Sequence, residues 1–186
     1  EIYTLSLHDA LPIFKEDFFT EHTLGPMMYD MFRRFLRDAG LNEKNHFTEF
    51  AQLIDDIGWE TDTALGLILV NLAMDNPQIA WYITNMDIGY FYERSQIEDM
   101  LVALDVKPKD AKSITKAFKR IVETPFCTTL NFGYVTDDDD MVRAKCSISD
   151  NRVVLYALYK FAEKCNLDKE FSVSYLRDET IERDGV

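Results

Sequence analysis

The chain of 186 residues is short of several features that mark whole classes of protein. Its three cysteines, Cys127, Cys146 and Cys165, lie far apart and form no Cys-x-x-Cys pair. A disulfide framework and a cysteine-rich metal site are therefore not expected, and a reducing, cytoplasmic location fits this cysteine usage best. The seven glycines are scattered singly, so the sequence has no glycine-rich loop of the kind that binds phosphate groups.

Long apolar runs and positive charge are also scarce. The longest apolar run, from Ala64 to Val70, is much shorter than the roughly 20 residues of a membrane-spanning helix, so no membrane partner is predicted. Twenty Lys and Arg residues stand against 33 Asp and Glu, and the net charge of −13 argues against a general nucleic-acid coat or an anionic membrane as partner. Apolar residues are abundant, since 47% of the chain is hydrophobic and 13% is aromatic, which is enough for a real core.

The first 13 residues, EIYTLSLHDALPI, are set apart from the rest of the chain. They resemble a translated sequencing adapter, and no turn signal or partner strand follows their alternating apolar residues. We therefore expect residues 1–13 to be non-native, and the natural chain to extend beyond this sequence at both ends. The remainder is long enough for one continuous domain, divided into a helical subdomain, 14–94, and a second segment, 95–186.

Apolar residues recur with helical spacing over most of the remaining chain, which predicts a mainly α fold. Ser95 with Glu98 is interpreted as the capping box of one helix. Thr61 or Thr63 is the expected N-cap of another helix, which has almost no polar position and is predicted to be the most buried. The expected helices are 26–40, 46–57, 61–74, a short one from 77, 95–104, 110–123, one that starts after Asp150, and 172–181.

After Pro125 the apolar spacing changes from the helical period to a period of two. Leu130, Phe132 and Tyr134 alternate with small or polar residues, an Asp-rich turn follows, and a second alternating run comes after it. This pattern predicts one β-hairpin at about 128–147. Two helices, a short turn and a hairpin stand in the order of a winged helix-turn-helix, so residues 95–186 are predicted to hold a winged-helix-like segment followed by C-terminal helices.

The segment from Lys107 to Glu123 is locally basic, with six basic residues against two acidic ones in an otherwise acidic chain. Residues off the apolar side of this predicted helix could reach phosphates and base edges, or a protein partner. Four aspartates at the predicted hairpin tip, Asp137 to Asp140, would repel a DNA backbone, so protein contact stays open beside DNA contact and DNA binding is expected to be weak. The predicted contact residues are Lys112, Ser113, Lys116, Lys119 and Arg120.

No arrangement in the sequence points to catalysis or to a bound cofactor. His46 and Glu49 could share a helix face, but a dinuclear carboxylate site needs such pairs on several helices. The aspartates of the predicted hairpin tip lack the alternating ligand spacing of a calcium loop. There is no Gly-x-Ser-x-Gly, and no cysteine lies in a recognisable Cys/His context. We therefore assign no catalytic, cofactor-binding or metal-binding residue, and we interpret the aromatic residues of WYITNMDIGYFYERS as core rather than as a base-stacking platform.

Four stretches carry a resemblance that covers nearly all of residues 14–186: EHTLGPMMYDMFRRFL, IGWETDTALGLILVNLA, SITKAFKRIVETPF and CSISDNRVVLYALYKFAEKCNL. They resemble the C-terminal helical part of bacterial phosphoadenosine phosphosulfate reductase-like proteins, of the type found in DNA phosphorothioation and phage defence. The resemblance implies an accessory domain of a sulfonucleotide reductase-like enzyme, whose partner is the N-terminal catalytic domain of the same chain.

The phosphate-binding loop of that family, which is rich in Gly and Ser, has no match in this sequence. No catalytic or nucleotide-binding residue can therefore be carried over, and an accessory helical domain without an active site of its own is expected. The alternative hypothesis is a winged-helix module that binds DNA or protein, performs no catalysis and has no link to sulfur chemistry.

Overall fold

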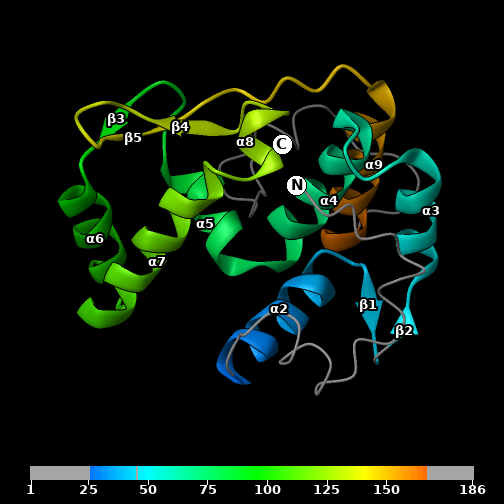
Figure 1. Ribbon diagram of the computed structural model, residues 1–186, viewed down its shortest axis with the longest axis horizontal. Coiled ribbons are helices and arrows are strands. Elements are labelled where there is room, and N and C mark those ends of the chain that lie inside the picture. Colours follow the sequence, from blue (N-terminus) through cyan, green and yellow to red (C-terminus); the bar gives the residue numbers. More distant parts are fainter. Residues whose placement is uncertain (1–25, 45, 167–186) are drawn as a thin grey trace, which may run out of the picture. The chain divides into compact units, whose positions relative to one another are not determined.

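The computed structural model describes residues 26–44 and 46–166 (Figure 1). These residues are mainly helical, as predicted. Residues 1–13 and the helix expected at 172–181 lie outside the described residues. The described residues fall into two compact units, which divide between Trp59 and Glu60. This division lies well before residue 94, where the sequence analysis placed the boundary between its two segments.

In its described residues, the first unit has two helices joined by a two-stranded antiparallel sheet. Its small core is made of aliphatic side chains, with Ala39, Leu41, Ala51 and Ile54 all buried. The elements are α2 (Pro26–Asp38), β1 (Asn42–Glu43), β2 (His46–Phe47) and α3 (Glu49–Ile57).

Local capping fixes where α3 begins and ends. Thr48 is its N-cap, and the Thr48 side chain accepts a hydrogen bond from the Ala51 N–H at 3.1 Å. The prediction that this helix starts at His46 is therefore wrong, because His46 pairs in a strand before the cap. Gly58 ends the helix with a φ of 95°, a backbone conformation that glycine adopts without a steric penalty.

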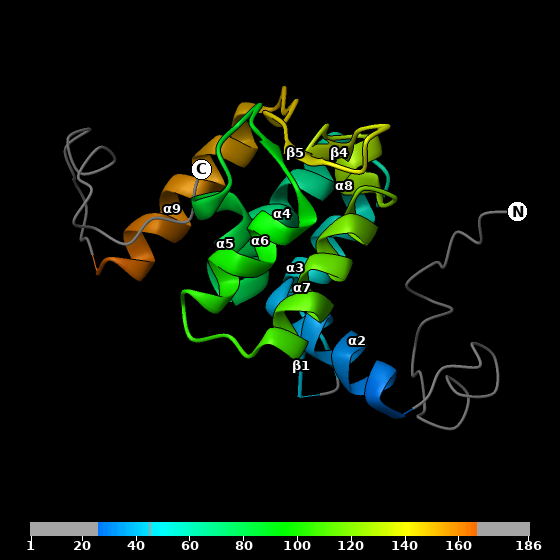
Figure 2. The same ribbon diagram turned by 90° about the vertical axis from the view of Figure 1, so that its left-hand side faces the viewer.

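The second unit contains the remaining helices and a three-stranded antiparallel sheet in the order β3-β5-β4. Two views at right angles both place this sheet at one end of helices α5, α6 and α7 (Figures 1 and 2). No helix of the described residues is long and apolar enough to cross a membrane. The elements are α4 (Asp62–Asp75), α5 (Pro77–Asn85), β3 (Phe91–Tyr92), α6 (Arg94–Val102), α7 (Pro108–Ile121), α8 (Pro125–Thr128), β4 (Gly133–Val135), β5 (Met141–Arg143) and α9 (Asn151–Lys164).

Helix α4 is the core of the second unit, which confirms the prediction for 61–74. Every residue from Thr63 to Ala73 is buried. Thr61 is the N-cap, since its side chain accepts a hydrogen bond from the Ala64 N–H at 3.1 Å. A helix that is apolar all round is stable in water only when other elements surround it, so α4 must lie at the centre of its unit.

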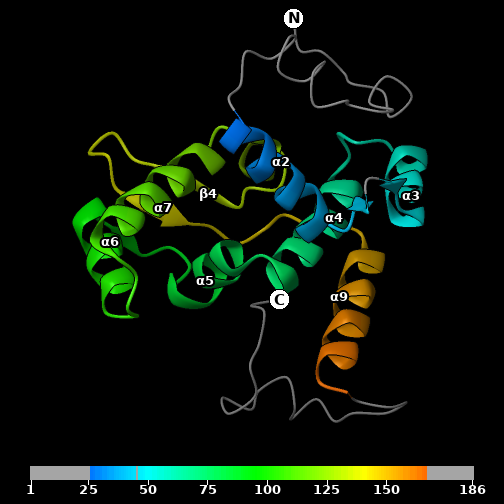
Figure 3. The same cartoon turned by 90° about the horizontal axis from the view of Figure 1, so that it is seen from below.

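Helix α9 packs alongside α4 (Figure 3), and hydrogen bonds join the two helices at three levels, the last of them from Lys164 Nζ to the Met74 carbonyl at 3.4 Å. Near the N-termini of the two helices, the Thr63 hydroxyl donates to Asp150 Oδ2 at 2.9 Å. Asp150 is the N-cap of α9, as predicted. Further along, the Tyr156 hydroxyl donates to Oδ1 of buried Asn71 at 2.7 Å, so the one polar side chain in the middle of α4 is hydrogen-bonded.

Aromatic side chains join α5, α7 and the sheet. The Trp81 ring stacks on Phe118 with centroids 5.6 Å apart, and Tyr82 contacts both Phe118, at 5.3 Å, and Phe132, at 4.9 Å. The side chain of Tyr82 is only 2% exposed. For Trp81 and Tyr82 the interpretation as core is confirmed, because their rings pack between elements. For Tyr90 and Phe91 of the same stretch it is wrong, since each is 55% exposed in the segment that enters β3.

The hairpin lies inside the predicted range but is much shorter. Helix α8 takes up the residues from Pro125, and Asn131 has a left-handed backbone with a φ of 55°, so regular pairing starts only at Gly133. The sheet also gains β3, a two-residue strand that no alternation in the sequence signals. With the β1–β2 pair, the described residues contain more β structure than the single hairpin that was predicted.

The capping box of α6 is shifted by two residues from its predicted place. Glu93 is the N-cap and Gln96 the third helical residue, and the Glu93 N–H donates to Gln96 Oε1 at 2.9 Å. Ser95 and Glu98 therefore do not form the box. The Ser95 hydroxyl donates to Glu93 at 3.3 Å instead, and Glu98 pairs with Arg94.

Candidate functional site

The candidate site is built on the helix pair α6–α7, which lie side by side (Figure 3). The connection between them is tight because Asp105 adopts a left-handed φ of 63°, and the Val106 N–H donates back to the Leu101 carbonyl at 3.2 Å. Pro108 is the first residue of α7, where its lack of an N–H is tolerated. The pair packs through buried Ile97 and Leu101 of α6.

Helix α7 has one buried side and one basic side. Ala111, Thr115 and Phe118 are buried, and the Thr115 hydroxyl donates to the Ala111 carbonyl at 3.0 Å. The predicted contact residues all lie on the exposed side, although the Ser113 hydroxyl turns back to donate to the Lys109 carbonyl at 3.1 Å. We call the exposed cations of this helix the basic face of α7: Lys109, Lys112, Lys116, Lys119 and Arg120.

The tip of the β4–β5 hairpin carries the aspartates Asp137 to Asp140, here called the acidic tip. Its turn is closed by the Thr136 N–H, which donates to the Asp140 carbonyl at 2.9 Å, and by Asp139, whose φ is 71°. Lys119 of α7 forms an ion pair with Asp139 of the tip, across 20 positions of sequence. The side chains of both partners are about half exposed, so the pair lies at the surface.

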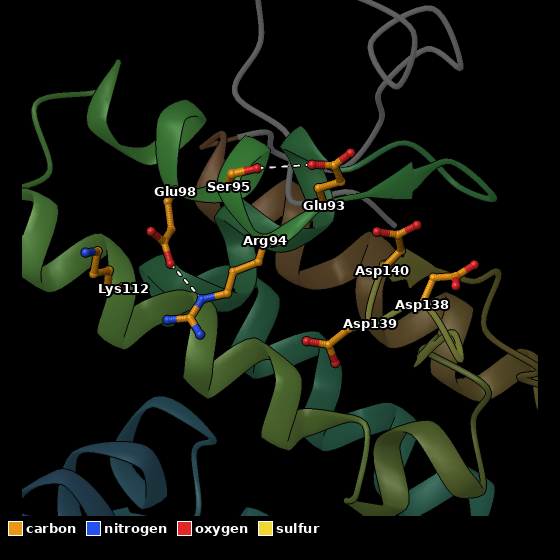
Figure 4. A pocket seen from close by; sticks show the side chains of 8 residues that line it. All are labelled: Glu93, Arg94, Ser95, Glu98, Lys112, Asp138, Asp139 and Asp140. Carbon is orange, nitrogen blue, oxygen red and sulfur yellow. Dashed lines mark hydrogen bonds and ion pairs between the residues drawn. The ribbon is translucent and has the colours of Figure 1, made fainter.

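An open hollow of about 680 Å³ lies between the acidic tip, the start of α6 and α7 (Figure 4). In the close-up, Arg94 projects into its middle and pairs with Glu98, with an Nε–Oε1 distance of 2.8 Å. Five carboxylates and two cations line this hollow, so its wall is negative. The lining residues are Glu93, Arg94, Ser95, Glu98, Lys112, Asp138, Asp139 and Asp140.

A second, much smaller hollow adjoins the first and has the opposite charge. It is lined by Arg94, Thr115, Lys116, Lys119, Asp139 and Met141, that is, by three cations and one carboxylate. Arg94 and Asp139 line both hollows, which makes them the residues that link the two walls. Neither residue was among the predicted contact residues, although Asp139 belongs to the four aspartates that were expected to repel a DNA backbone. For Arg94, the spacing of four residues to Glu98 along a helix was the signal in the sequence.

A group of half-buried and buried titratable side chains, from α5, α8, β5 and the segment after β5, lines neither hollow. Burial raises the pKa of Cys127 to about 11, and the Gly133 N–H, which donates to this thiol, opposes that shift. Burial likewise raises the pKa values of Cys146 and Tyr82. Thiols with raised pKa values are protonated at neutral pH and are poor nucleophiles, so this group has the chemistry of core side chains.

Arg143 lies in the same group, and burial lowers the pKa of its guanidinium. Its Nη1 donates to the Met86 carbonyl at 3.0 Å, a contact that fixes the loop before β3 to strand β5. The role that follows from these contacts is structural.

The histidine and carboxylate considered for a metal site are not on one helix. His46 lies in β2 and Glu49 opens α3, so the idea that they share a helix face is wrong. Across residues 26–44 and 46–166, no group of three or more His, Cys, Asp or Glu side chains is arranged to hold a metal ion.

Comparisons with known proteins give no relative from which a role could be transferred. No family model, no curated protein sequence and no solved structure matches the chain.

Proposed function

We propose that the second unit acts as a non-catalytic winged-helix module that binds a partner protein through the basic face of α7. The observation that carries this proposal is the order of elements, α5-β3-α6-α7-α8-β4-β5, with the antiparallel sheet order β3-β5-β4. The four-residue helix α8 is an addition between α7 and the hairpin. In a winged helix-turn-helix, a helix, a strand, two helices and a hairpin follow one another, and the second helix of the pair contacts the partner. Helix α7 holds that position here.

The exposure of α7 supports this role. One side of the helix packs through Ala111, Thr115 and Phe118, and the opposite side leaves its cations in solvent. A stripe of exposed Lys and Arg side chains steers association with a negatively charged partner and fixes the orientation of docking.

The charge around α7 favours protein over DNA as the partner. The segment from Lys107 to Glu123 has four net positive charges, and the acidic tip has four negative ones, so together they are neutral. Proteins bind duplex DNA mainly by neutralising its phosphates with Lys and Arg side chains. A surface without net positive charge therefore gains little affinity for DNA. DNA contact by Lys112, Ser113, Lys116, Lys119 and Arg120 is the second candidate function, supported by the position of α7.

We further propose, on the resemblance of the four sequence stretches, that the parent protein is a phosphoadenosine phosphosulfate reductase-like protein. The chain would then be its accessory helical domain, and the partner of α7 would be the N-terminal catalytic domain. An acidic surface on that domain is the feature that would match the basic face.

The test of the protein role is a titration of the 186-residue chain with the proposed N-terminal catalytic domain, followed by calorimetry. We expect binding that weakens by about tenfold or more when Lys116 and Lys119 are changed to Glu, because both charges would oppose an acidic surface. The matched control changes Lys160 and Lys164 of α9 to Glu and should leave the affinity within about twofold.

Two results would contradict the proposals separately. An upstream sequence without a Gly/Ser-rich phosphate loop would overturn the reductase-like assignment. Unchanged binding in the K116E/K119E variant would overturn α7 as the contact helix. The DNA alternative is tested with a duplex in rising salt: it predicts that K116E/K119E abolishes binding, and that each lost phosphate contact lowers the slope of log affinity against log salt by about one unit.

A further inference from the structure

We infer that the acidic tip screens the basic face of α7 against polyanions, so that nucleic acid is excluded while a protein partner can still dock. The inference rests on α7 being the contact helix of the proposed function. It extends that function by assigning to Asp137–Asp140 the role of a specificity determinant.

The first observation is the ion pair between Lys119 and Asp139, which holds the tip of the hairpin against the C-terminal end of the basic face. A phosphate that approaches Lys119 has to displace a carboxylate that is already there. The pair is half exposed and therefore weak, so it excludes a ligand by competition and not by rigid obstruction.

The second observation is that cations of α7 and carboxylates of the acidic tip line the same two hollows. Lys112 lines the larger hollow together with Asp138, Asp139 and Asp140, and Lys116 and Lys119 line the smaller one together with Asp139. Three of the five cations of the basic face therefore share a wall with carboxylates of the tip. At physiological salt, charges interact over about 8 Å, which is the scale of groups that line one hollow.

The third observation concerns local geometry, since the tip is built to present carboxylates. Its turn is closed by hydrogen bonds of Thr136, whose hydroxyl accepts the Asp140 N–H at 3.1 Å and whose carbonyl accepts the Asp139 N–H at 3.0 Å. These contacts use backbone groups and Thr136, and none of them needs an aspartate side chain. The four carboxylates can therefore be neutralised without breaking the turn.

A polyanion gains affinity by releasing counterions from the phosphates that a protein neutralises. Carboxylates that lie next to the lysines cancel part of their positive charge, so each lysine attracts a phosphate less strongly. The same carboxylates repel the neighbouring phosphates of the nucleic acid. Removing the charge of the tip should therefore expose a latent polyanion-binding surface on α7.

The experiment compares the full chain with a variant in which Asp137, Asp138, Asp139 and Asp140 are changed to Asn. The probe is a fluorescent DNA duplex of mixed sequence, measured by anisotropy at about 50 mM salt and at higher salt. We expect the variant to bind at least about tenfold more tightly than wild type, with a slope of log affinity against log salt that is steeper by one unit or more.

A control with the same change in net charge separates the tip from a general charge effect. It carries neutral amides at Asp30, Asp56, Asp75 and Glu60, all exposed and outside the two hollows. This control should stay within about threefold of wild type, because none of its four carboxylates lines a hollow together with a cation of α7. Adding K116E and K119E to the tip variant should remove the gained affinity.

A tip variant that binds the duplex no better than wild type or no better than the control would overturn the inference. Failure of the screening inference can be distinguished from failure of the proposed function. Micromolar, salt-dependent DNA binding by the wild-type chain would argue against a protein-only role for α7, whereas the screening role depends on the ratio between the tip variant and wild type.

Discussion

Helices α4 and α7 have the same length, 14 residues each, but they differ in how many of their side chains are buried. In α4 every position from Thr63 to Ala73 is buried, and in α7 only Ala111, Thr115 and Phe118 are. Helix α4 contributes buried side chains on every side. Helix α7 packs with one side and leaves the other side free to contact a partner. Substitutions in α4 should therefore change stability, and substitutions on the basic face of α7 should change binding.

The largest effect is expected from Leu72→Ala in α4. Leu72 is fully buried, and truncation removes apolar contacts and leaves a cavity, so the free energy of unfolding should fall by about 2–5 kcal/mol. Urea denaturation followed by circular dichroism measures the loss. The matched control is Leu104→Ala, at a residue that is 58% exposed and that should change stability by less than about 0.5 kcal/mol. Equal losses in the two variants would contradict the central place of α4.

The next effect comes from adding volume to α4 at Gly66. A Cβ at this position would lie 3.0 Å from Cγ1 of Val153 in α9, which is tighter than ordinary contact. Gly66→Leu should therefore lower the free energy of unfolding by about 1–3 kcal/mol, and Val153→Ala in the same chain should restore part of it. A Gly66→Leu variant as stable as wild type would show that α9 does not pack against this turn of α4.

A smaller effect is expected from Tyr156→Phe, which removes the hydroxyl that donates to Asn71 inside the α4–α9 contact. Loss of this hydrogen bond should cost about 1 kcal/mol of unfolding free energy. Tyr159→Phe, on the same helix and 68% exposed, is the control and should be neutral. Should both variants melt at the same temperature, Asn71 would not depend on Tyr156 for a partner.

The smallest effect is expected on the basic face. Lys119→Ala and Asp139→Asn should each change the free energy of unfolding by less than about 0.5 kcal/mol, because both partners of the ion pair are exposed. A double-mutant cycle should give a coupling energy of about 0.2–1 kcal/mol that declines as salt is raised. A coupling several times larger would mean that the pair is part of the structural core and not of a contact surface.

The sequence predicted the parts of the fold that depend on periodicity. The all-apolar run of α4 could be stable only when buried, and the period of 3.6 in α7 separated Phe118 from Lys112 and Lys116 without knowledge of their neighbours. The order of helices and hairpin followed from the change to a period of two after Pro125.

The sequence could not predict features for which several neighbouring residues carry the same signal, or for which the partner lies far away in the chain. Glu93 with Gln96 and Ser95 with Glu98 are both pairs three residues apart, and only the place where the chain turns decides which of them forms the box. Strand β3 is two residues long and has no period to detect. The Lys119–Asp139 pair joins α7 to a hairpin 20 positions away, and its formation depends on the tertiary placement of the turn.

The most direct test of the account is zero-length carbodiimide cross-linking of the native chain, followed by peptide mass spectrometry. Carbodiimide joins an amine to a carboxylate only where the two are in contact. We expect a cross-link between Lys119 and the acidic tip that disappears in D139N. Lys160 and Glu163, 3.3 Å apart on α9, are the internal positive control. A Lys160–Glu163 product without any product between α7 and Asp137–Asp140 would contradict the contact between tip and helix, and with it the screening of the basic face.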